Sequence, residues 1–452
     1  MLRVRMVFGL ALALATTCAA GLPSRADDGE SPAERGRNLL LGRSFIGPAW
    51  TASAYGNASS AWNEPHPDLA DDPEGYSSAF ARRYGLHPAP YPNDGMPMGL
   101  RKATSKNGAK TGLQIDCMAC HGGSIGGTSY VGLGNSQLDM TSLFRDLNLA
   151  DGRRFVPIPF TLNTSRGTVN AGQMSVFLLS LRNPDLSFRA FPLATGANIP
   201  ELDTPAWWIL GKKATKYYDG RTDARSARSN MQFMLGELSL KEFQDLEPAF
   251  NDIDAYLKSI KAPKYPFAID DAKAHRGERV FTKNCAKCHG TYGETPSYPS
   301  KIVPIEIIGT DPARLNGISD KFIAHYNATW FADRPVTEEA IGYQAPPLDG
   351  IWATAPYLHN GSVPTLHQLL KSSERPAKFR RPASTDFEHY DMTKIGWKNE
   401  PVTEPSDPKT PPKDAKFLFD SARWGLSNKG HTFGDKLSEE DRLDVIEYLK
   451  TL

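Results

Sequence analysis

Two copies of one five-residue pattern constrain this chain more than any other feature of its sequence. Cys-x-x-Cys-His occurs at residues 117–121 and again at residues 285–289. Two thiols three residues apart on one turn can each form a thioether with a vinyl group of a porphyrin, and the adjacent histidine then lies under the ring as an iron ligand. The sequence therefore predicts two covalently bound c-type haems. Haem 1 is held by Cys117, Cys120 and His121, and haem 2 by Cys285, Cys288 and His289.

Other roles of paired cysteines explain the pattern less well. The chain has five cysteines, and all of them except Cys18 belong to the two motifs. Two structural disulfides would leave both trailing histidines unexplained, and a four-cysteine zinc site would need neither histidine. A thioredoxin-like motif would need a βαβ setting, which the sequence does not show.

The N-terminus has the pattern of a signal peptide. Arg3 and Arg5 precede an apolar run at 6–15 that is too short to span a bilayer, and small residues follow. We predict a signal peptide over residues 1–26, with cleavage after Ala20 or Ala26. A lipoprotein modified at Cys18 is less favoured, because the preceding residues match the lipidation pattern poorly. The mature chain is expected to be periplasmic or secreted and to have no integral membrane span.

Composition narrows the class of protein further. The chain has 452 residues, more than one hydrophobic core usually serves, and 40% of them are apolar. The 52 Lys and Arg residues nearly balance 51 Asp and Glu residues, so no basic excess points to nucleic acid.

Similar helical segments in both halves predict a tandem arrangement. Residues 253–260 and 445–452 have similar endings with apolar residues at i, i+3, i+4 and i+7. Helices are also expected near 34–45 and just before the second motif, where proline-rich residues 262–266 precede the segment. We expect a mostly α fold of two cytochrome c-like helical domains with long haem-wrapping loops. The N-terminal domain would span 27–262, the linker 263–269 and the C-terminal domain 270–452. The alternative is one larger helical domain with two haems.

The histidines are distributed unequally between the two haems. A haem that only carries electrons usually has both axial positions filled, whereas one that activates peroxide or oxygen keeps a position open. No histidine lies between His121 and His275, so haem 1 is the better candidate for the open, reactive site. Its sixth ligand could come only from His66, His87, Met96, Met98 or Met140, or be absent. Haem 2 has five downstream histidines and Met392, and among these we predict His359, in a loop after an Ala-Pro pair, as a metal ligand.

Together these motifs resemble the bacterial di-haem cytochrome c peroxidase superfamily, which includes the MauG enzymes. Beyond the haem motifs, the resemblance rests on Asp-Gly-Arg at 219–221 and Thr-Ala-Pro-Tyr-Leu-His-Asn-Gly at 354–361. Asn-Ser-Gln at 135–137 and Thr-Pro-Ala-Trp-Trp at 204–208 are similar to sequences of its rubber-oxygenase-like branch.

The resemblance also implies roles for residues outside the haem motifs. Tyr218 stands where the peroxidases have an aromatic electron relay between the haems, and Trp208 is a second candidate for this role. Glu237 lies near the place of the peroxidases' distal glutamate, and Phe233 near that of a phenylalanine covering an oxygen-binding haem in the rubber oxygenases. Core packing is the alternative for these aromatic residues. Gln137 stands where many peroxidases have a displaceable histidine. Calcium is implied by the resemblance alone.

Three functions are compatible with these features. The first is a peroxidase-type oxidoreductase in which a small redox protein donates electrons to haem 2 and peroxide reacts at haem 1. The second is an oxygenase that cleaves an apolar substrate with O₂. The third is a non-catalytic electron-transfer cytochrome with both irons six-coordinate.

Overall fold

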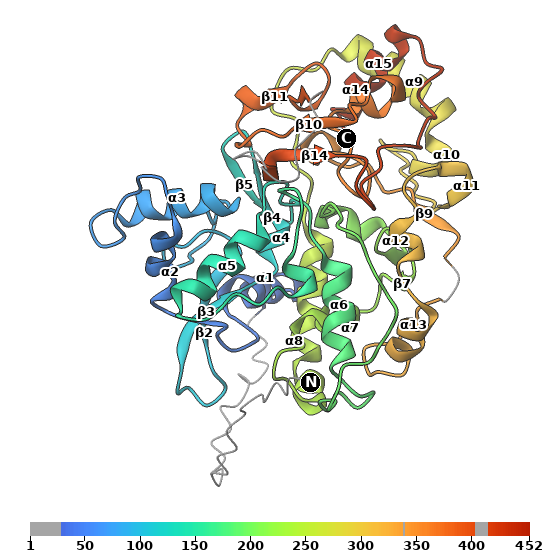
Figure 1. Cartoon of the computed structure of the whole chain (residues 1–452). Coiled ribbons are helices and arrows are strands. Elements are labelled where there is room, and N and C mark those ends of the chain that lie inside the picture. Colours follow the sequence, from blue (N-terminus) through green and yellow to red (C-terminus); the bar gives the residue numbers. More distant parts are fainter. Residues whose placement is uncertain (1–28, 338–339, 403–414) are drawn as a thin grey trace. The chain divides into compact units, whose positions relative to one another are not determined.

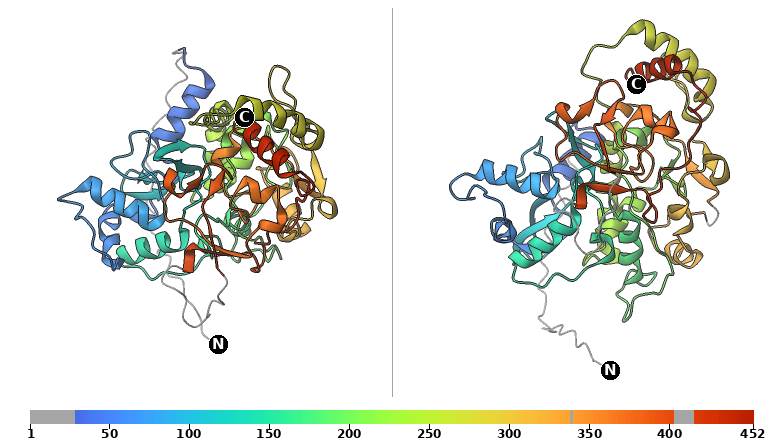
Figure 2. Two further views of the ribbon diagram at one scale, coloured as in Figure 1. Left: turned by 90° about the horizontal axis from the view of Figure 1, so that it is seen from above. Right: turned by 45° about the horizontal axis from the view of Figure 1, so that its top comes forward.

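A computed structural model of the chain describes residues 29–337, 340–402 and 415–452 (Figure 1). Its main helices pack in two pairs. Helix α1 (Pro32–Gly42) packs on α8 (Leu240–Ser259), and α9 (Asp271–Asn284) packs on α15 (Glu439–Leu449). Figure 2 shows α9 and the red C-terminal α15 side by side. The helices expected near 34–45, before the second motif and at the two similar endings are therefore present. The predicted signal peptide and Cys18 lie outside the described residues.

The two helix crossings are built in the same way. A Cβ atom added to Gly36 would lie 1.9 Å from the carbonyl oxygen of Asp252, and one added to Gly277 would lie 1.9 Å from that of Asp444. Only glycine allows so close an approach of two helix backbones. The preceding arginine forms an ion pair at each crossing, from Arg35 to Asp252 at 2.8 Å and from Arg276 to Asp444 at 2.7 Å.

Local sequence signals explain where these helices begin. Ser239 caps α8 in a capping box with Glu242, and Asp270 caps α9. Ser438 caps α15. The buried face of α8 repeats every three to four residues, as an amphipathic helix requires; it consists of Phe243, Leu246, Phe250, Ile253, Asp254 and Leu257.

The remaining α-helices have between 4 and 12 residues, and the segments between them are long. Those before residue 263 are α2 (Ala54–Asn57), α3 (Pro73–Tyr84), α4 (Met118–His121), α5 (Met140–Ala150), α6 (Ala171–Ser180) and α7 (Arg228–Met231). Those after it are α10 (Ala286–His289), α11 (Ile305–Ile308), α12 (Ala313–Asn316), α13 (Asp320–Asn327) and α14 (Leu366–Leu369).

Small antiparallel sheets occupy part of the space between the helices. One three-stranded sheet has the order β1-β3-β2 and another the order β13-β10-β14, while β4-β5, β6-β7, β8-β9 and β11-β12 form pairs. The mostly α expectation is thus met only in part, because short segments with β-branched and aromatic residues, such as Thr128–Val131, pair as strands. The strands are β1 (Trp50–Thr51), β2 (Leu100–Thr104), β3 (Thr111–Ile115), β4 (Gly122–Ile125), β5 (Thr128–Val131), β6 (Thr215–Lys216), β7 (Thr222–Asp223), β8 (Ile302–Pro304), β9 (Gly342–Gln344), β10 (Lys378–Arg380), β11 (Tyr390–Asp391), β12 (Gly396–Trp397), β13 (Glu400–Pro401) and β14 (Leu418–Asp420).

Two main hydrophobic cores follow the two helix pairs. The N-terminal core gathers around Phe243 and Phe250 of α8, and the C-terminal core around Phe281 of α9 and Val445 of α15. A third cluster forms around Phe80 of α3. The N-terminal core also contains residues from later in the chain, because α13, which follows the predicted linker, packs in it. Residues 32–452 accordingly form one compact unit, and the division into two domains at 263–269 stays a prediction.

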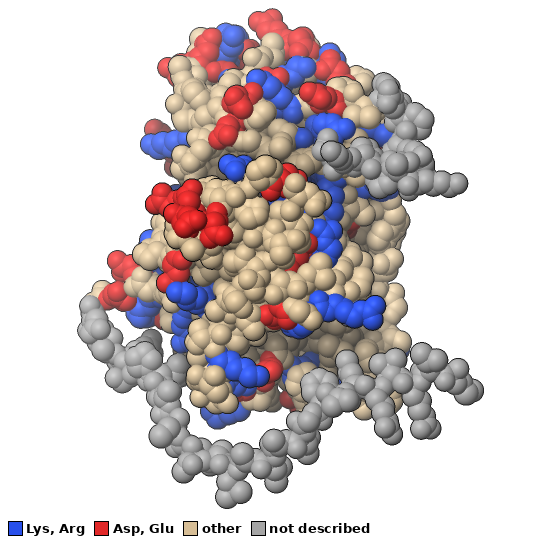
Figure 3. Space-filling model, turned by 60° about the vertical axis from the view of Figure 1, so that its left-hand side comes forward, with Lys and Arg blue, Asp and Glu red and all other residues tan. Residues whose placement is uncertain are grey.

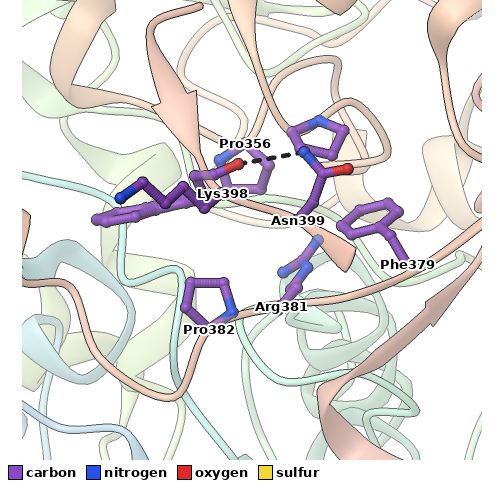
Figure 4. Close-up of a pocket in the computed structure, with 8 residues that line it drawn as sticks. Pro356, Phe379, Arg381, Pro382, Lys398 and Asn399 are labelled. Atoms are coloured by element: carbon purple, nitrogen blue, oxygen red, sulfur yellow. Dashed lines mark hydrogen bonds between the residues drawn. The ribbon is translucent and has the colours of Figure 1, made fainter. Parts of the chain in front are cut away.

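Arg381 joins segments from both halves of this unit. Its guanidinium donates to the carbonyl of Arg166 through Nη1 and to that of Gly361 through Nη2, each at 2.7 Å. Burial, only partly offset by Asp203, lowers its pKa to about 10. In Figure 4, Arg381 borders a small cavity beside Pro382 and Phe379.

The surface carries both signs of charge. Lys and Arg side chains are interspersed with Asp and Glu on the face shown in Figure 3, in keeping with the net charge of +1. Among the described residues, no helix combines the length and the apolar character needed to cross a membrane.

Candidate functional site

Each Cys-x-x-Cys-His motif forms a single helical turn. Cys117 precedes α4, and Cys285 joins the end of α9 to α10. All four motif cysteines are half-buried free thiols. The turn at 117–121 is braced by Asp116, which accepts a hydrogen bond from the backbone of Met118 at 2.8 Å and pairs with Arg101. The structure thus brings the two thiols and the histidine of each motif together, as thioether attachment requires.

A backbone carbonyl orients the histidine of the second motif. Nδ1 of His289 lies 2.8 Å from the carbonyl oxygen of Pro346. A proton on Nδ1 donates to this carbonyl, which fixes the tautomer and leaves Nε2 available for iron. Burial lowers the pKa of His289, so its neutral, metal-binding form is favoured.

The histidine of the first motif has a related setting. Burial lowers the pKa of His121 to about 4, against a smaller opposite effect of the backbone carbonyl of Pro205. Nδ1 of His121 is buried without a partner in ordinary hydrogen-bond geometry. Its ring stacks on that of Trp207, with 4.6 Å between centroids and 22° between planes.

The two proline carbonyls belong to a structural repeat. Residues 204–221 and 345–362 align without a gap, so that Pro205 matches Pro346. Tyr217 and the matching Leu358 have φ of 64° and 66°, values that non-glycine residues rarely adopt. The next residues, Tyr218 and His359, are therefore equivalent, and their rings meet edge-on at 6.0 Å. The gapless alignment could have been found from the sequence, but the shared backbone geometry could not.

His431 is the histidine that faces His289. Their ring centroids lie 6.2 Å apart, and the planes are inclined by 63°. Two metal–nitrogen bonds of about 2 Å, with about 1 Å from each nitrogen to its ring centre, require a separation of about 6 Å. Burial and the neighbouring His289 and Arg375 lower the pKa of His431 to about 3. In the sequence His431 is one of the five histidines downstream of the second motif, and nothing in its flanking residues distinguishes it from the other four.

His359 lies elsewhere, at the contact between the two repeats. It is buried and stacks on Tyr343, with 4.4 Å between ring centroids, and its Nε2 has no hydrogen-bond partner. Its predicted role as an iron ligand stays a prediction. Three other histidines are engaged in the fold. His325 contacts the carbonyl of Leu179, His367 lies between Glu374 and Glu439, and His389 pairs with Glu388.

The histidines upstream of the first motif are also engaged. Nε2 of His87 lies 3.1 Å from Oδ1 of Asn135, and its Nδ1 lies 2.7 Å from Oγ of Ser124. With both ring nitrogens in hydrogen bonds, His87 has none left for iron. His66 is exposed and contacts the carbonyl of Pro67. Met96 and Met98 are buried in hydrophobic clusters, and Met140 is packed against one of them.

The structure places the other predicted site residues in different surroundings. Tyr218 donates from its hydroxyl to the carbonyl of Asp203 at 2.9 Å, and burial raises its pKa well above 10. Phe233 is half-buried in the 3₁₀ helix Gln232–Met234 and belongs to none of the hydrophobic cores of the described residues. Glu237 is exposed, and its backbone carbonyl accepts from Lys106.

Trp208 and Gln137 reach from the first half of the chain to the second. The indole N–H of Trp208 donates to the carbonyl of Asp349 at 2.7 Å. The side-chain amide of Gln137 donates to the carbonyl of Pro382 at 3.2 Å, and its Oε1 is buried without a partner.

A buried cluster of charges fits the anionic edge of a haem. Oδ2 of Asp219 forms ion pairs with Nε of Arg221 and Nη1 of Arg314, each at 3.2 Å, so two guanidinium groups share one carboxylate. Nε of Arg314 is buried without a hydrogen-bond partner. This buried N–H would donate to a haem propionate. Within the described ranges no group of three or more His, Cys, Asp and Glu side chains could hold a metal ion, so the calcium implied by the resemblance stays a prediction.

Comparison with curated proteins identifies relatives. The y4iM protein of Sinorhizobium fredii is 33% identical over 316 residues, which cover 60% of this chain and 69% of the relative. The chain belongs to the same family as y4iM. The y4iJ protein of the same bacterium is 28% identical over 262 residues, covering 43% of this chain and 41% of the relative. Both relatives are uncharacterised.

A family model and two solved structures complete the comparison. Residues 342–380 match the model described as RoxA-like, cytochrome c-like, a segment that contains Pro346, His359 and β9. A MauG-like protein associated with microbial copper homeostasis is 15% identical with a TM-score of 0.28, over 62% of this chain and 89% of the other. A hydrazine synthase of Kuenenia stuttgartiensis is 14% identical with a TM-score of 0.22, over 61% and 85%. TM-scores this low do not establish a shared fold.

The RoxA-like match confirms the resemblance to the di-haem peroxidase and MauG superfamily drawn from the sequence motifs. The match also supports the assignment of this chain to the cytochrome c-type haem oxidoreductases.

Proposed function

We propose that this protein is an exported di-haem c-type cytochrome that acts as an oxidoreductase of the cytochrome c peroxidase type. The site of Cys117, Cys120 and His121 is the reactive one, and the site of Cys285, Cys288 and His289 transfers electrons. A small redox protein outside the cytoplasm supplies the electrons.

One observation carries this division of roles, namely the unequal supply of second histidines. His431 faces His289 at a separation that suits one iron between two imidazoles. His87, upstream of His121, has both ring nitrogens in hydrogen bonds instead. We therefore propose His431, in place of His359, as the second axial ligand of haem 2, and an open position at haem 1.

The bound haems would supply one-electron redox chemistry and, at the open position, activation of an O–O bond. The protein's own residues orient and shield these sites. Pro346 holds Nδ1 of His289 as a donor, so that Nε2 can ligate. Arg314 offers its unpartnered guanidinium edge to a propionate. Phe233, which belongs to no hydrophobic core within the part of the chain that the structure describes, would cover the open face of haem 1 and exclude water.

Peroxide and oxygen chemistry place different demands on the reactive site. Breaking peroxide by acid–base catalysis needs a base within hydrogen-bond reach of the bound oxygen. Glu237 is exposed, so its position does not support a role as that base. An apolar phenylalanine cover favours the second candidate, an oxygenase that cleaves an apolar substrate with O₂.

Absorption and EPR spectra of the purified protein test the division of roles. We expect one high-spin and one low-spin ferric haem, with His431→Ala converting the low-spin haem to high-spin. The matched control is His389→Ala, a half-exposed histidine, which should leave the spectrum unchanged. Two low-spin haems in the unmodified protein would refute the open site and favour a pure electron carrier.

Turnover then separates the two enzymatic candidates. Peroxide-dependent oxidation of a reduced cytochrome or copper protein would support the peroxidase. Oxygen uptake on a polyisoprene-like substrate would support the oxygenase.

A further inference from the structure

The segment that follows Pro205 is anchored to the histidine of the first motif through the backbone. The N–H of Trp207 donates to the carbonyl of Gly132 at 2.8 Å, and the N–H of Gly132 donates to the carbonyl of His121 at 2.7 Å. Gly132 has φ of 94°, and a Cβ atom added to it would lie 3.2 Å from that of Trp207. Glycine at this position therefore leaves room for the indole beside His121.

The second repeat is anchored to its motif in a similar way. Leu348 matches Trp207 in the gapless alignment, and its N–H donates to the hydroxyl of Tyr292 at 2.6 Å. The same hydroxyl donates to the carbonyl of His289 at 3.3 Å. One intervening residue thus links each repeat to the histidine of its motif, so the two proline carbonyls approach these histidines on similarly held backbones.

The side chains of the two histidines are nevertheless held differently. Nδ1 of His289 lies 2.8 Å from the carbonyl oxygen of Pro346. The carbonyl of Pro205 lies near His121, but Nδ1 of His121 has no partner in ordinary hydrogen-bond geometry among the described residues. The imidazole of His121 instead stacks on the indole of Trp207, with 4.6 Å between centroids and 22° between planes. Stacking therefore fixes the ring of His121 where a hydrogen bond fixes that of His289.

A hydrogen bond from Nδ1 affects the iron as well as the orientation of the ring. An imidazole that donates to a carbonyl is a more basic ligand, because the bond increases the electron density on the ring. A more basic ligand stabilises ferric over ferrous iron and so lowers the reduction potential. The iron above His121 should therefore have a higher potential than a histidine held like His289 would give it.

We propose that Trp207 is a positioning residue, which holds His121 by stacking in place of a hydrogen bond and thereby raises the reduction potential of haem 1. This inference rests on the proposed function, in which haem 1 is the reactive site, and deepens it. Haem 2, with His289 bonded to a carbonyl and His431 as a second basic ligand, would have the lower potential. Electrons supplied by the redox partner would then reside mainly on the iron that has the open position.

An anaerobic redox titration of the intact two-haem protein, followed in the absorption bands of the high-spin and low-spin haems, tests this role. We expect the high-spin haem to be reduced first. Trp207→Leu introduces the matching residue of the second repeat and frees the ring of His121 to donate to the carbonyl of Pro205 or to water. The ratio of ferrous to ferric haem 1 at a fixed potential should then fall by about tenfold, a shift of about 59 mV for one electron. Trp207→Phe keeps an aromatic ring against His121, so this ratio should stay within about twofold of the unmodified protein.

Resonance Raman spectra of the ferrous protein report the bond between iron and His121 directly. A five-coordinate high-spin ferrous haem with one histidine shows an iron–nitrogen stretching band, which a six-coordinate low-spin haem lacks, so the band belongs to haem 1 alone. It should move to higher frequency in Trp207→Leu, because a more basic, hydrogen-bonded imidazole binds iron more tightly. Looser packing of the core by itself would not raise this frequency.

Two further variants complete the design. Trp352→Leu makes the same change at a buried tryptophan of the C-terminal core, whose indole donates to the carbonyl of Pro263. It should leave the ratio of ferrous to ferric haem 1 within about twofold of the unmodified protein. Gly132→Ala disturbs the stack from its other side, because the added Cβ would press on Trp207. It should shift the potential and the band in the same direction as Trp207→Leu, and it provides the test if Trp207→Leu fails to bind haem.

An unchanged potential and band in Trp207→Leu would overturn the inference, as would an equal shift in Trp207→Phe. Neither measurement uses peroxide, O₂ or a redox partner. A protein without turnover would therefore disprove the proposed enzymatic function and leave the effect of Trp207 in place. Two low-spin haems would refute the open site, and the titration would still compare the potentials of the variants.

Discussion

Replacing Gly36 with alanine tests whether the crossing of α1 and α8 is a backbone contact. The added Cβ would lie 1.9 Å from the carbonyl oxygen of Asp252, a backbone atom that cannot rotate away. An ordinary contact needs roughly 3.5 Å, so the helices must separate by roughly 1.5 Å. Such overpacking costs about 1–3 kcal/mol, and weakening the half-exposed pair of Arg35 and Asp252 adds up to about 1 kcal/mol. The better helix propensity of alanine returns up to about 1 kcal/mol. We expect a net loss of about 2 kcal/mol.

The assay is urea denaturation followed by circular dichroism, with Gly42→Ala as the control in the same helix. No atom lies within 4 Å of a Cβ built on Gly42, so this change should alter the free energy of unfolding by no more than about 0.5 kcal/mol. Equal denaturation midpoints for the two variants would refute the account of the crossing. Since Gly277 meets Asp444 at the same separation, Gly277→Ala should reproduce the loss at the other helix pair.

Three further predictions concern acid stability and the two haem motifs. Burial lowers the pKa of His87 from 6.5 to about 4, so the folded protein holds this histidine neutral. The stability that comes from this pKa difference is complete above pH 6.5. It is lost as the pH falls towards 4, at up to about 1.4 kcal/mol for each pH unit. Denaturation midpoints at pH 7 and pH 5 should therefore differ less in His87→Gln than in the unmodified protein, and an equal difference would contradict this. Cys285→Ser with Cys288→Ser should lower the haem content by pyridine haemochrome from two to one, retaining the high-spin band; retention of the low-spin band instead would reverse the assignment of the sites. His121→Ala should abolish turnover while the low-spin spectrum of haem 2 persists, and full activity would disprove chemistry at haem 1.

The helix pairs show which parts of the fold the sequence could predict. The similar endings at 253–260 and 445–452 predicted helices that the structure contains as the C-terminal parts of α8 and α15. Apolar spacing and capping residues act within one or two turns, so they are readable locally. The close approach at Gly36 and Gly277 was not predicted, because it depends on which backbone lies opposite.

The haem sites divide in the same way. Covalent attachment needs only two cysteines three residues apart and the histidine that follows, so the two Cys-x-x-Cys-His motifs alone predict two haem attachment sites and one histidine ligand for each. The facing of His431 and His289, the stacking of Trp207 on His121, and the exposure of Glu237 are tertiary facts. They join residues separated by up to 142 positions or depend on the packing of distant segments, which no local spacing encodes.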